Sequence, residues 1–258
     1  MAPIAHGRIV SVFAAKGGCG KTTLATNLAV VLNARGSRRV CLVDLDLTFG
    51  DVASSLRLEP RRSLVDIVPM AGKVDLVAIR SVVTPFCPGL DCVLAPVRPG
   101  ESELVSSGLV GELLAELACW YDYVVIDTPA QFTPPVLIAL DSAHHHVLLT
   151  TPERPALASL RLTLDMLDLL SYQREARSIV FNRCDSSVGL SAAEVERVVK
   201  SPIAGHIPSS RDVPASINEG VPLALAQPDH PVSRAVRGFA AAHLVPTKKG
   251  NPNVEANP

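Results

Sequence analysis

The sequence has no long apolar run and no surplus of charge of either sign. Its 258 residues include 24 Lys and Arg and 25 Asp and Glu, so the net charge is −1. No segment reaches the roughly 18 consecutive apolar residues that a membrane-spanning helix needs, and residues 1–7 lack the pattern of a signal peptide. The charge balance argues against a generally nucleic-acid-binding surface. We therefore expect a cytoplasmic protein without an integral membrane segment.

The cysteines and histidines form no recognisable metal or redox motif. The six cysteines, at positions 19, 41, 87, 92, 119 and 184, include no Cys-x-x-Cys pair, which favours reduced thiols in a cytosolic protein. His144, His145 and His146 are consecutive, but neighbouring side chains on a strand point to opposite faces. The three histidines are therefore not expected to bind one metal ion.

Apolar segments alternate with helical patterns along most of the chain, which is typical of a parallel sheet covered by helices. We predict an α/β fold of three layers, a mostly parallel twisted sheet with helices on both faces. Strands are expected at residues 8–14, 40–45, 91–95, 123–126, 146–150, 178–181 and 203–207, and helices at 22–34, 103–119, 134–141, 156–170, 192–200 and 232–243. One domain is expected over residues 8–245, after an extension of residues 1–7 and before a tail, 246–258, whose composition predicts disorder.

A glycine-rich stretch joins the first predicted strand to the first predicted helix: Ala15-Lys16-Gly17-Gly18-Cys19-Gly20-Lys21-Thr22-Thr23. Small residues let successive backbone N–H groups, here those of Gly17 to Thr23, curl around a phosphate and direct a helix N-terminus at it. Lys21 is expected to reach the β- and γ-phosphates, and the Thr22 hydroxyl to hold Mg²⁺. The spacing fits the pattern G-x-x-x-x-G-K-[ST] with Ala15 in the first position, and it predicts a P-loop NTPase.

Three acids lie at or beside the ends of predicted strands. Asp44 and Asp46 are two residues apart at the end of the strand at 40–45, so they are expected to share a face. Parallel sheets place ligand-facing residues at the carboxyl ends of their strands, and two carboxylates there suit Mg²⁺ and an attacking water. Asp127 ends the apolar segment that starts at Tyr123, and it is expected to hold Mg²⁺ through a water.

The loop from Lys16 to Thr22 resembles that of the deviant Walker A ATPases of the MinD/ParA family, which reads K-G-G-x-G-K-[ST]. In that family the extra lysine reaches the nucleotide of the partner subunit, and two chains enclose two ATP molecules. The resemblance implies a slow ATPase and an ATP-dependent homodimer in which Lys16 acts in trans on the charge of the γ-phosphoryl group. It also implies that Asp46 positions or activates the attacking water and that Asp44 supports the metal.

The same resemblance places the adenine contacts after two later strands. Asn182 and Pro208 lie where the family contacts adenine, and an asparagine amide can both donate to and accept from the base. A turn-forming asparagine is the alternative for Asn182. Two positions depart from the family pattern: Gln131 replaces the glycine of the switch II loop, and Ser210 replaces the usual aspartate.

The segments around these motifs look most like the CpaE/TadZ branch of the family, in particular its actinobacterial members, which are associated with the assembly and polar placement of type IVb (Flp/Tad) pili. These segments are residues 49–52, 59–66, the region after Asp127, and residues 182–185, 207–214 and 220–222. The resemblance implies a switch that positions or assembles a pilus or secretion apparatus through a protein partner in a membrane-associated complex. The protein would then be cytoplasmic, or peripheral at the membrane or cell pole. MinD-type proteins usually end in a membrane-binding amphipathic helix, and residues 246–258 lack its apolar face and basic flank.

Two other functions are compatible with the sequence. Arginine pairs at positions 61/62, 174/177 and 234/237 could form a DNA-binding face in a dimer, as in ParA-type partition proteins, although solvated surface arginines are commoner. A non-hydrolysing scaffold stabilised by nucleotide is the second, and Ala15 and Gln131 are compatible with it. Lys16, Asp44, Asp46 and Asp127 favour hydrolysis instead.

Overall fold

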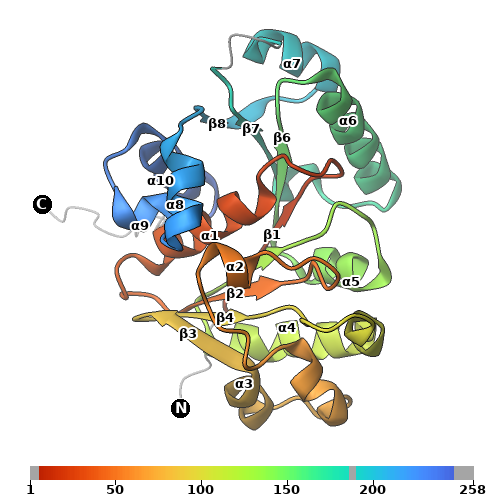
Figure 1. Cartoon of the computed structure of the whole chain (residues 1–258). Helices are drawn as coiled ribbons and strands as arrows, with labels where there is room; N and C mark the ends of the chain where they lie inside the picture. Colours follow the sequence, from red (N-terminus) through yellow and green to blue (C-terminus); the bar gives the residue numbers. More distant parts are fainter. Residues whose placement is uncertain (1–5, 186–189, 247–258) are drawn as a thin grey trace, which may run out of the picture.

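An eight-stranded sheet lies at the centre of the computed structural model, which describes residues 6–185 and 190–246 (Figure 1). The strands are β1 Arg8–Phe13, β2 Val40–Asp44, β3 Val83–Cys87, β4 Leu90–Val93, β5 Tyr123–Asp127, β6 His145–Thr150, β7 Arg177–Asn182 and β8 Ile203–Ile207. Their order is β3-β4-β2-β5-β1-β6-β7-β8, and all neighbours are parallel except β3 and β4. This confirms the predicted α/β fold with a mostly parallel sheet. The predicted tail lies outside the described residues from position 247 onward.

Helices cover both faces of the sheet. They are α1 Lys21–Asn33, α2 Val52–Ser55, α3 Leu76–Val82, α4 Ser107–Trp120, α5 Pro134–Ser142, α6 Arg154–Leu169, α7 Ala192–Val199, α8 Asp212–Glu219, α9 Leu223–Ala226 and α10 Pro231–His243, with 3-10 turns η1 Leu64–Met70, η2 Glu101–Leu104 and η3 Arg174–Ala176. One apolar cluster joins α1, α9 and α10 to the sheet, and two further clusters join α3 to α7 to it. In the described ranges, no helix is long and apolar enough to cross a membrane.

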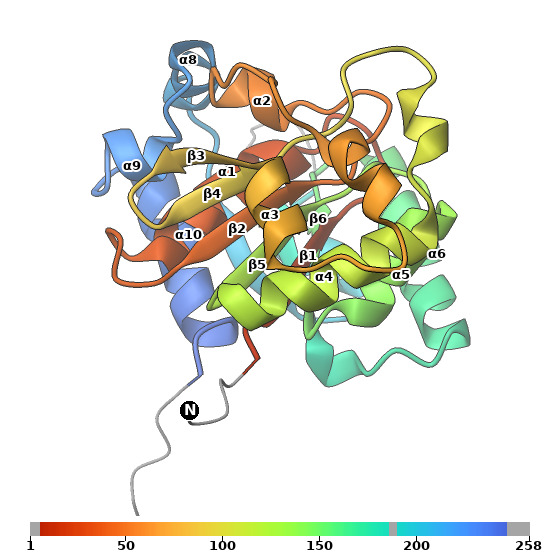
Figure 2. The same ribbon diagram turned by 90° about the horizontal axis from the view of Figure 1, so that it is seen from below.

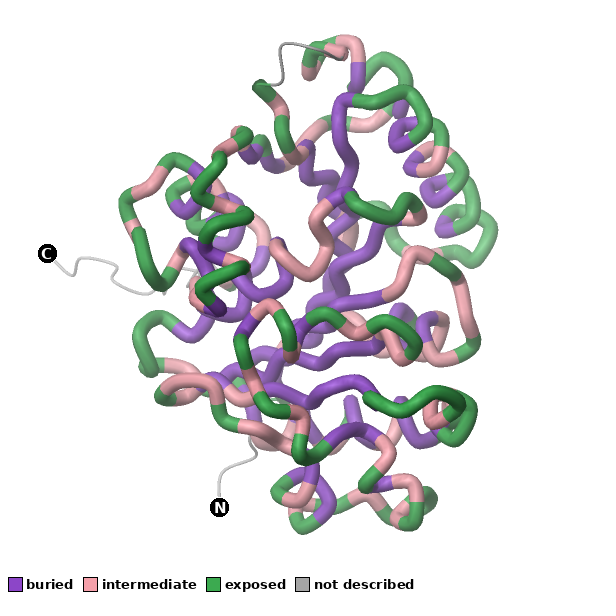
Figure 3. The backbone as a smooth tube through the Cα atoms, viewed as in Figure 1, coloured by how far each residue is buried: buried purple, intermediate pink, exposed green. Residues whose placement is uncertain are grey.

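The central strands are the most deeply buried part of the chain (Figure 3). Every residue of β2 and β5 is buried. Parallel strands covered on both faces need apolar side chains on both sides, which explains the continuous apolar runs in the sequence. The last residue of each of these strands is the exception, because β2 ends in Asp44 and β5 ends in Asp127.

The edge strand β3 was not predicted from the sequence. Figure 2, which shows the sheet from below, places β3 beside β4 and near α3. Pro85 lies within β3, and proline is compatible with an edge strand, where a missing N–H group breaks no bond of the sheet interior. Strand β3 pairs antiparallel with β4, with Thr84 opposite Cys92, and is the last strand on this side of the sheet.

The predicted helix at 103–119 was wrong at its beginning. The chain forms the short turn η2, then leaves the helical conformation at Val105 and Ser106 before α4 begins. The Ser106 hydroxyl accepts a hydrogen bond from the N–H of Leu109 at 3.2 Å. Serine is a preferred N-cap residue because its side chain satisfies such a free donor, so it starts a helix here.

The winding of the chain brings the ends of several strands together. From β1, the chain first fills the side of the sheet that holds β2 to β5 and then the side that holds β6 to β8. In parallel α/β sheets, ligands bind beyond the carboxyl ends of the strands, where the winding reverses. The phosphate loop after β1 and the acids of β2 and β5 lie at this edge.

Candidate functional site

The phosphate loop lies between β1 and α1. Gly18 and Gly20 have φ angles of 78° and 95°, in the left-handed region that favours glycine. A Cβ atom at Gly18 would have no neighbour within 4 Å, but one at Gly20 would lie 2.8 Å from the Asn182 Nδ2 atom. Gly18 is therefore required by its backbone conformation, and Gly20 also by the close approach of Asn182.

Helix α1 starts directly after Gly20 without a side-chain cap and without an acid in its first turn. The first N–H groups of a helix have no partner within the helix. The start of α1 therefore presents N–H groups and the positive end of the helix dipole to an anion. Lys21 and Thr22, which are half-buried, belong to this first turn.

Lys16 lies on the exposed side of the same loop, next to the exposed Gly17 and Gly18, whereas Cys19 is buried. Within residues 6–185 and 190–246, neither Lys16 nor Lys21 takes part in an ion pair with an acid. Both ammonium groups are thus available to an anionic ligand, Lys21 from the helix and Lys16 from the outer side of the loop.

Asp127 lies beside Thr22 at the end of β5. The Thr22 hydroxyl donates to Asp127 Oδ2 at 2.5 Å, while Asp127 Oδ1 is buried and has no hydrogen-bond partner. Burial raises the pKa of the Asp127 carboxyl to about 7, although the hydrogen bond from Thr22 and the charge of Lys21 lower it. A buried carboxylate oxygen without a partner is costly, so Oδ1 suits a cation or a metal-bound water.

Asp44 lies directly opposite Asp127 on the neighbouring strand β2. Its Oδ1 atom accepts a hydrogen bond from the N–H of Asp46, and its Oδ2 atom accepts one from the N–H of Val52, each at 3.1 Å. Burial, followed by the charge of Asp127, raises the pKa of Asp44 well above its usual range. The two carboxyls therefore oppose each other's ionisation unless a positive charge lies near them.

The residues present fit Mg²⁺ better than a metal held by protein ligands alone. In the described part of the chain, no three side chains of His, Cys, Asp or Glu are grouped to hold a metal ion. Mg²⁺ commonly takes one or two carboxylates and completes its shell with phosphate oxygens and waters. Thr22, Asp127 and Asp44 beside an open phosphate loop match that donor set.

The expectation that Asp44 and Asp46 share a face of one strand is corrected by the structure. Strand β2 ends at Asp44, and the chain turns so that the backbone of Asp46 donates to the Asp44 carboxylate. Asp44 is buried, whereas Asp46 is half-buried and its Oδ1 atom accepts from the N–H of Phe49 at 3.1 Å. Their environments differ, so they are suited to different tasks.

A cavity of about 310 Å³ extends from the phosphate loop towards the end of β8. Its walls combine apolar side chains with a few polar ones, contributed by α1, α8, α10 and the loops after β7 and β8: Gly20, Thr23, Leu24, Asn27, Asn182, Arg183, Ile207, Pro208, Ser209, Ser210, Val213, Pro214, Ile217, Val232 and Val236. A mostly apolar cavity with a few placed polar groups is typical of a small-molecule site. Helix α8 was missed in the sequence because it is short and has Pro214 in its first turn.

Asn182 and Pro208 both line this cavity. The Asn182 amide is partly engaged, since its Nδ2 atom donates to the carbonyl of Cys19 at 2.8 Å and its Oδ1 atom accepts from the N–H of Arg183 at 3.0 Å. Arg183 has a positive φ of 55°. Asn182 therefore shapes a turn and also lies at the cavity wall, so the two interpretations of this residue are compatible.

The segment after β5 carries Gln131 where the family pattern has glycine, and the structure shows how this segment is held. Thr128 is buried, and its hydroxyl donates to the carbonyl of Val12 at 2.8 Å. Gln131, at the position of the expected glycine, is exposed. This loop is thus anchored to β1 through Thr128, while Gln131 faces solvent.

The three consecutive histidines each contact a different partner. His144 Nδ1 accepts from the N–H of Ile9, His145 Nε2 contacts Ser178 Oγ, and His146 Nδ1 contacts Ser11 Oγ, at 3.0, 2.8 and 3.0 Å. Burial lowers the pKa values of His145 and His146 to about 4. These histidines stabilise β6 between its neighbours as neutral groups.

Ionisation of Asp127 is expected to destabilise the nucleotide-free protein. Because its pKa is raised from 3.8 to about 7, the stability present at acid pH is lost as the pH rises through 7. Asp127→Asn keeps an acceptor for Thr22 but carries no charge. We expect this variant to exceed the wild type in free energy of unfolding by about 2–4 kcal/mol at pH 8 and by little at pH 4.

Urea unfolding at pH 4, 6 and 8 without Mg²⁺ or nucleotide measures this difference. Asp229→Asn is the matched control, since the Asp229 side chain is 97% exposed, and its effect should be small at every pH. His145 and His146 also make the free energy of unfolding depend on pH, but their effect is the same in all three proteins and cancels in the differences between them. A difference between Asp127→Asn and wild type that does not change with pH would contradict the expected ionisation.

Residues 10–223 match the family described as the CobQ/CobB/MinD/ParA nucleotide binding domain. The septum site-determining protein MinD of Thermotoga maritima is 27% identical over 230 residues, which cover 85% of this chain and 82% of that protein. A ParA family ATPase from Chlorobium tepidum has a TM-score of 0.85 at 24% identity, over 91% of this chain and 98% of that one. MinD from Pyrococcus horikoshii, solved with Mg-ADP, has a TM-score of 0.79 at 24% identity, over 92% and 95%. The chain belongs to the CobQ/CobB/MinD/ParA family of nucleotide-binding domains.

Proposed function

We propose that this protein is a dimeric switch that binds ATP with Mg²⁺ and slowly hydrolyses it to ADP and phosphate. The observation that carries the proposal is the buried Asp127 Oδ1 atom without a partner, beside the Thr22 hydroxyl and an open phosphate loop. The Pyrococcus horikoshii MinD structure holds Mg-ADP, and the residues of this chain suit the same kind of ligand.

The phosphate end of the site divides its tasks among a few residues. The N–H groups of Gly17 to Thr23 enclose the phosphates, and the Lys21 ammonium group lies with the β- and γ-phosphates. Thr22 and Asp127 hold the metal, and Asp44 supports it. Mg²⁺, when bound, neutralises negative charge on the phosphate oxygens. Its charge also stabilises both carboxylates in their ionised form.

Asp46 is suited to orient the attacking water. One of its oxygens already accepts from the N–H of Phe49, which fixes the side chain at the end of the turn. The other oxygen accepts a hydrogen bond from water, placing that water for attack on the γ-phosphoryl group. Because Asp46 is half-buried, it remains accessible to solvent, as a water-orienting group must.

Lys16 supplies its charge to the nucleotide of a second protomer. It is exposed on the outer side of the loop and has no ion-pair partner in the described ranges. Charge that develops on the γ-phosphoryl oxygens is stabilised by a positioned cation. ATP binding therefore favours the homodimer, and hydrolysis followed by phosphate release weakens it.

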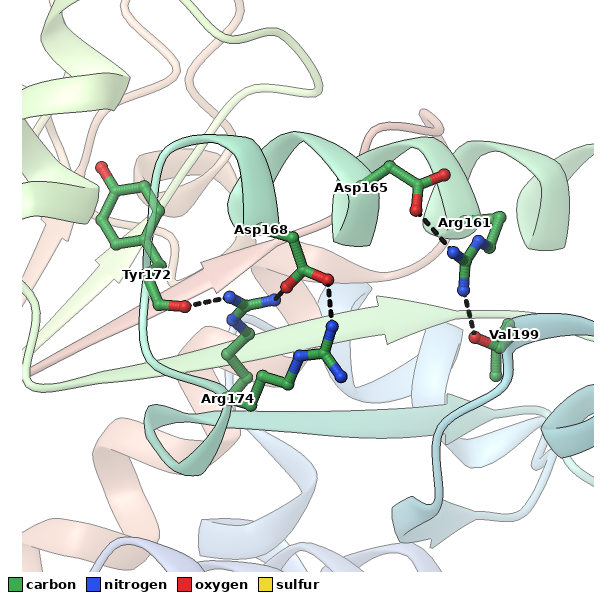
Figure 4. A network of polar contacts seen from close by, with 7 residues as sticks. Arg161, Asp165, Asp168, Tyr172, Arg174 and Val199 are labelled. Carbon is green, nitrogen blue, oxygen red and sulfur yellow. Dashed lines mark hydrogen bonds and ion pairs between the residues drawn. The ribbon is translucent and has the colours of Figure 1, made fainter.

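DNA partition is the less favoured function. Of the candidate arginines, Arg174 and Arg177 both contact the Asp168 carboxylate, at 2.6 and 2.7 Å, and the Arg177 side chain is only 5% exposed (Figure 4). Arg61 contacts Glu59 at 2.6 Å. Arg177, which is buried and shared with a carboxylate, contributes little to phosphate binding, which needs accessible cations. The Arg61 and Arg174 side chains are 83% and 78% exposed, but each is paired with a carboxylate that offsets its charge.

The cellular role that we propose is the positioning or assembly of a Flp/Tad-type pilus or secretion apparatus. It is supported by the resemblance to the CpaE/TadZ branch of residues 49–52, 59–66, 182–185, 207–214 and 220–222 and of the region after Asp127. The ATP-bound dimer would bind a protein partner in a membrane-associated complex, and hydrolysis would release it. The protein is then cytoplasmic and reaches the membrane or the cell pole through that partner.

ATP is expected to convert a monomer into a dimer. Size-exclusion chromatography with light scattering should show monomer in Mg-ADP and a transient dimer in Mg-ATP, while Asp46→Ala binds ATP and stays dimeric because hydrolysis is blocked. Wild-type dimer in both nucleotides would instead indicate a scaffold. ATP-dependent binding of DNA that is lost steeply with salt would indicate a partition protein.

The action of Lys16 in trans is tested by mixing two inactive variants. Lys16→Ala keeps Asp46, and Asp46→Ala keeps Lys16, so only a mixed dimer can combine both groups at one nucleotide. If the lysine acts in trans, an equimolar mixture should recover up to about a quarter of wild-type turnover, given random pairing in a two-fold dimer. Activity no higher than that of the separate variants would indicate that Lys16 acts on its own nucleotide.

The pilus role is tested in the cell. A strain that carries Lys21→Ala in place of the wild-type protein should lose Flp/Tad-type pili, because the phosphate loop no longer holds ATP, whereas Asp229→Asn should keep them. Pilus number by electron microscopy, with plasmid retention measured in parallel, checks this. Normal piliation together with plasmid loss would favour DNA partition.

A further inference from the structure

We propose that the Ser210 hydroxyl recognises the base of the nucleotide by donating a hydrogen bond to N1 of adenine. His230 and the backbone of Asp212 act as positioning groups that set the direction of this donor. The inference rests on the proposed function, since it takes ATP as the ligand of the cavity described above. It assigns base recognition to a position at which this chain carries serine.

Ser210 lines the end of the cavity that is remote from the phosphate loop. The cavity wall runs from Gly20, after β1, past Asn182 at the end of β7, to Ser210 after β8. Strand β8 is three strands away from β1, which is about 14 Å at the usual strand spacing. A nucleotide with its phosphates at Gly20 therefore directs the far edge of its base, where N1 lies in a purine, towards Ser210.

The middle of the cavity suits a flat ring. Leu24 of α1, Val213 and Ile217 of α8, and Val232 and Val236 of α10 line it with apolar side chains. Such walls hold an aromatic base by its faces and contribute no hydrogen bonds. Selection among bases must therefore come from the polar groups at the edge of the ring.

The proton of the His230 ring is placed by the start of α10. His230 is the N-cap of this helix, and its Nδ1 atom accepts a hydrogen bond from the N–H of Val232 at 3.1 Å. A neutral imidazole has one donor nitrogen and one acceptor nitrogen. Because Nδ1 is the acceptor, Nε2 carries the hydrogen and donates towards Ser210 Oγ and Asp212 Oδ2, each at 3.3 Å.

Ser210 Oγ is surrounded by donors on its protein side. It accepts from the N–H of Asp212 at 3.1 Å and faces the Nε2–H group of His230. A hydroxyl has two acceptor lone pairs and one hydrogen. With both lone pairs directed at protein donors, the hydroxyl hydrogen remains for an acceptor in the cavity.

The other amides of the cavity wall are already engaged. Asn27 donates to the carbonyl of Thr23 and accepts from the N–H of Ala224, both at 2.8 Å. Asn182 donates to the carbonyl of Cys19 and accepts from the N–H of Arg183. Arg183 also lines the cavity and is a donor, but its Nη2 atom donates to the carbonyl of Gly18 on the phosphate-loop side. Ser210 is therefore a side chain at the β8 end of the cavity whose remaining hydrogen-bonding group is a donor.

A fixed donor distinguishes the purine bases by the state of N1. Adenine N1 is an acceptor, whereas guanine and hypoxanthine carry a hydrogen on N1. A donor that faces N1–H leaves both groups unpaired, and an unpaired buried polar group is costly. A carboxylate at position 210 would read the 6-amino group of adenine instead, because it accepts hydrogen bonds.

The test is the binding of Mg²⁺ complexes of ATP, 1-deaza-ATP and 7-deaza-ATP to wild type and to Ser210→Ala. In wild type, 1-deaza-ATP should bind roughly fivefold more weakly than ATP, the loss of one net hydrogen bond, while 7-deaza-ATP should bind like ATP. Ser210→Ala should bind ATP about fivefold more weakly and no longer distinguish ATP from 1-deaza-ATP.

Two further variants separate recognition from folding. Ser209→Ala removes a neighbouring hydroxyl of the same cavity and should keep the preference for ATP over 1-deaza-ATP. His230→Asn preserves the cap of α10, since asparagine is a good N-cap residue, but has no group at the Nε2 position. It should reduce the preference without abolishing ATP binding, a change that a purely structural role of His230 would not produce.

The outcomes distinguish this inference from the function on which it rests. A preference for ATP over 1-deaza-ATP that persists in Ser210→Ala would overturn the role of Ser210. A Ser210-dependent loss with 7-deaza-ATP would overturn the assignment to N1. If folded wild type binds none of the three nucleotides, the proposed ATPase function itself fails and this inference fails with it.

Discussion

Two buried carboxylates on neighbouring strands impose the main constraint on this molecule. Asp44 and Asp127 are register partners at the carboxyl ends of β2 and β5, and burial raises the pKa of both. A parallel sheet aligns the ends of its strands at one edge, so the fold itself brings the acids together. The protein tolerates this because the same edge carries the phosphate loop, where a cation and a nucleotide can balance the charge. Folding and ligand binding are thereby linked through one pair of side chains.

The Asp44 carboxylate also determines where the loop after β2 lies. Its two oxygens accept from the N–H groups of Asp46 and Val52, so one side chain holds both ends of the turn. Gly50 lies inside this turn, and a Cβ atom there would be 2.4 Å from Ala95 Cβ and 2.7 Å from Asp44 Oδ2. The position of Asp46 is therefore coupled to the charge on Asp44. In the proposed mechanism, a change in metal or phosphate at the buried pair would therefore shift Asp46, the residue proposed to orient the water.

Much of this arrangement could be predicted from the sequence because it depends on local patterns. The buried strands are continuous apolar runs, and the order Gly18, Gly20, Lys21, Thr22 fixes a loop conformation by itself. The edge strand β3 could not be predicted in this way, since Pro85 argues against a strand until its place at the edge is known. The different environments of Asp44 and Asp46 could not be predicted either, because the end of β2 depends on a side-chain contact with a turn.

Ser210 and His230 illustrate the same limit at the other end of the site. They are 20 positions apart and meet only because β8 and the start of α10 lie together, and no spacing rule connects a serine after a strand to a histidine N-cap. The direction of this hydrogen bond follows only from the structure, because the cap of α10 determines which nitrogen of His230 donates.

Asn182 connects the two ends of the site. Its amide holds the carbonyl of Cys19, and Gly20 has no side chain where Asn182 approaches. Arg183 adds a contact from its Nη2 atom to the carbonyl of Gly18 at 3.3 Å. The end of β7, which forms one wall of the cavity, is thus fastened to the phosphate loop and also positions it. For the proposed nucleotide ligand, binding of the base and binding of the phosphates would therefore both depend on the geometry of this strand end.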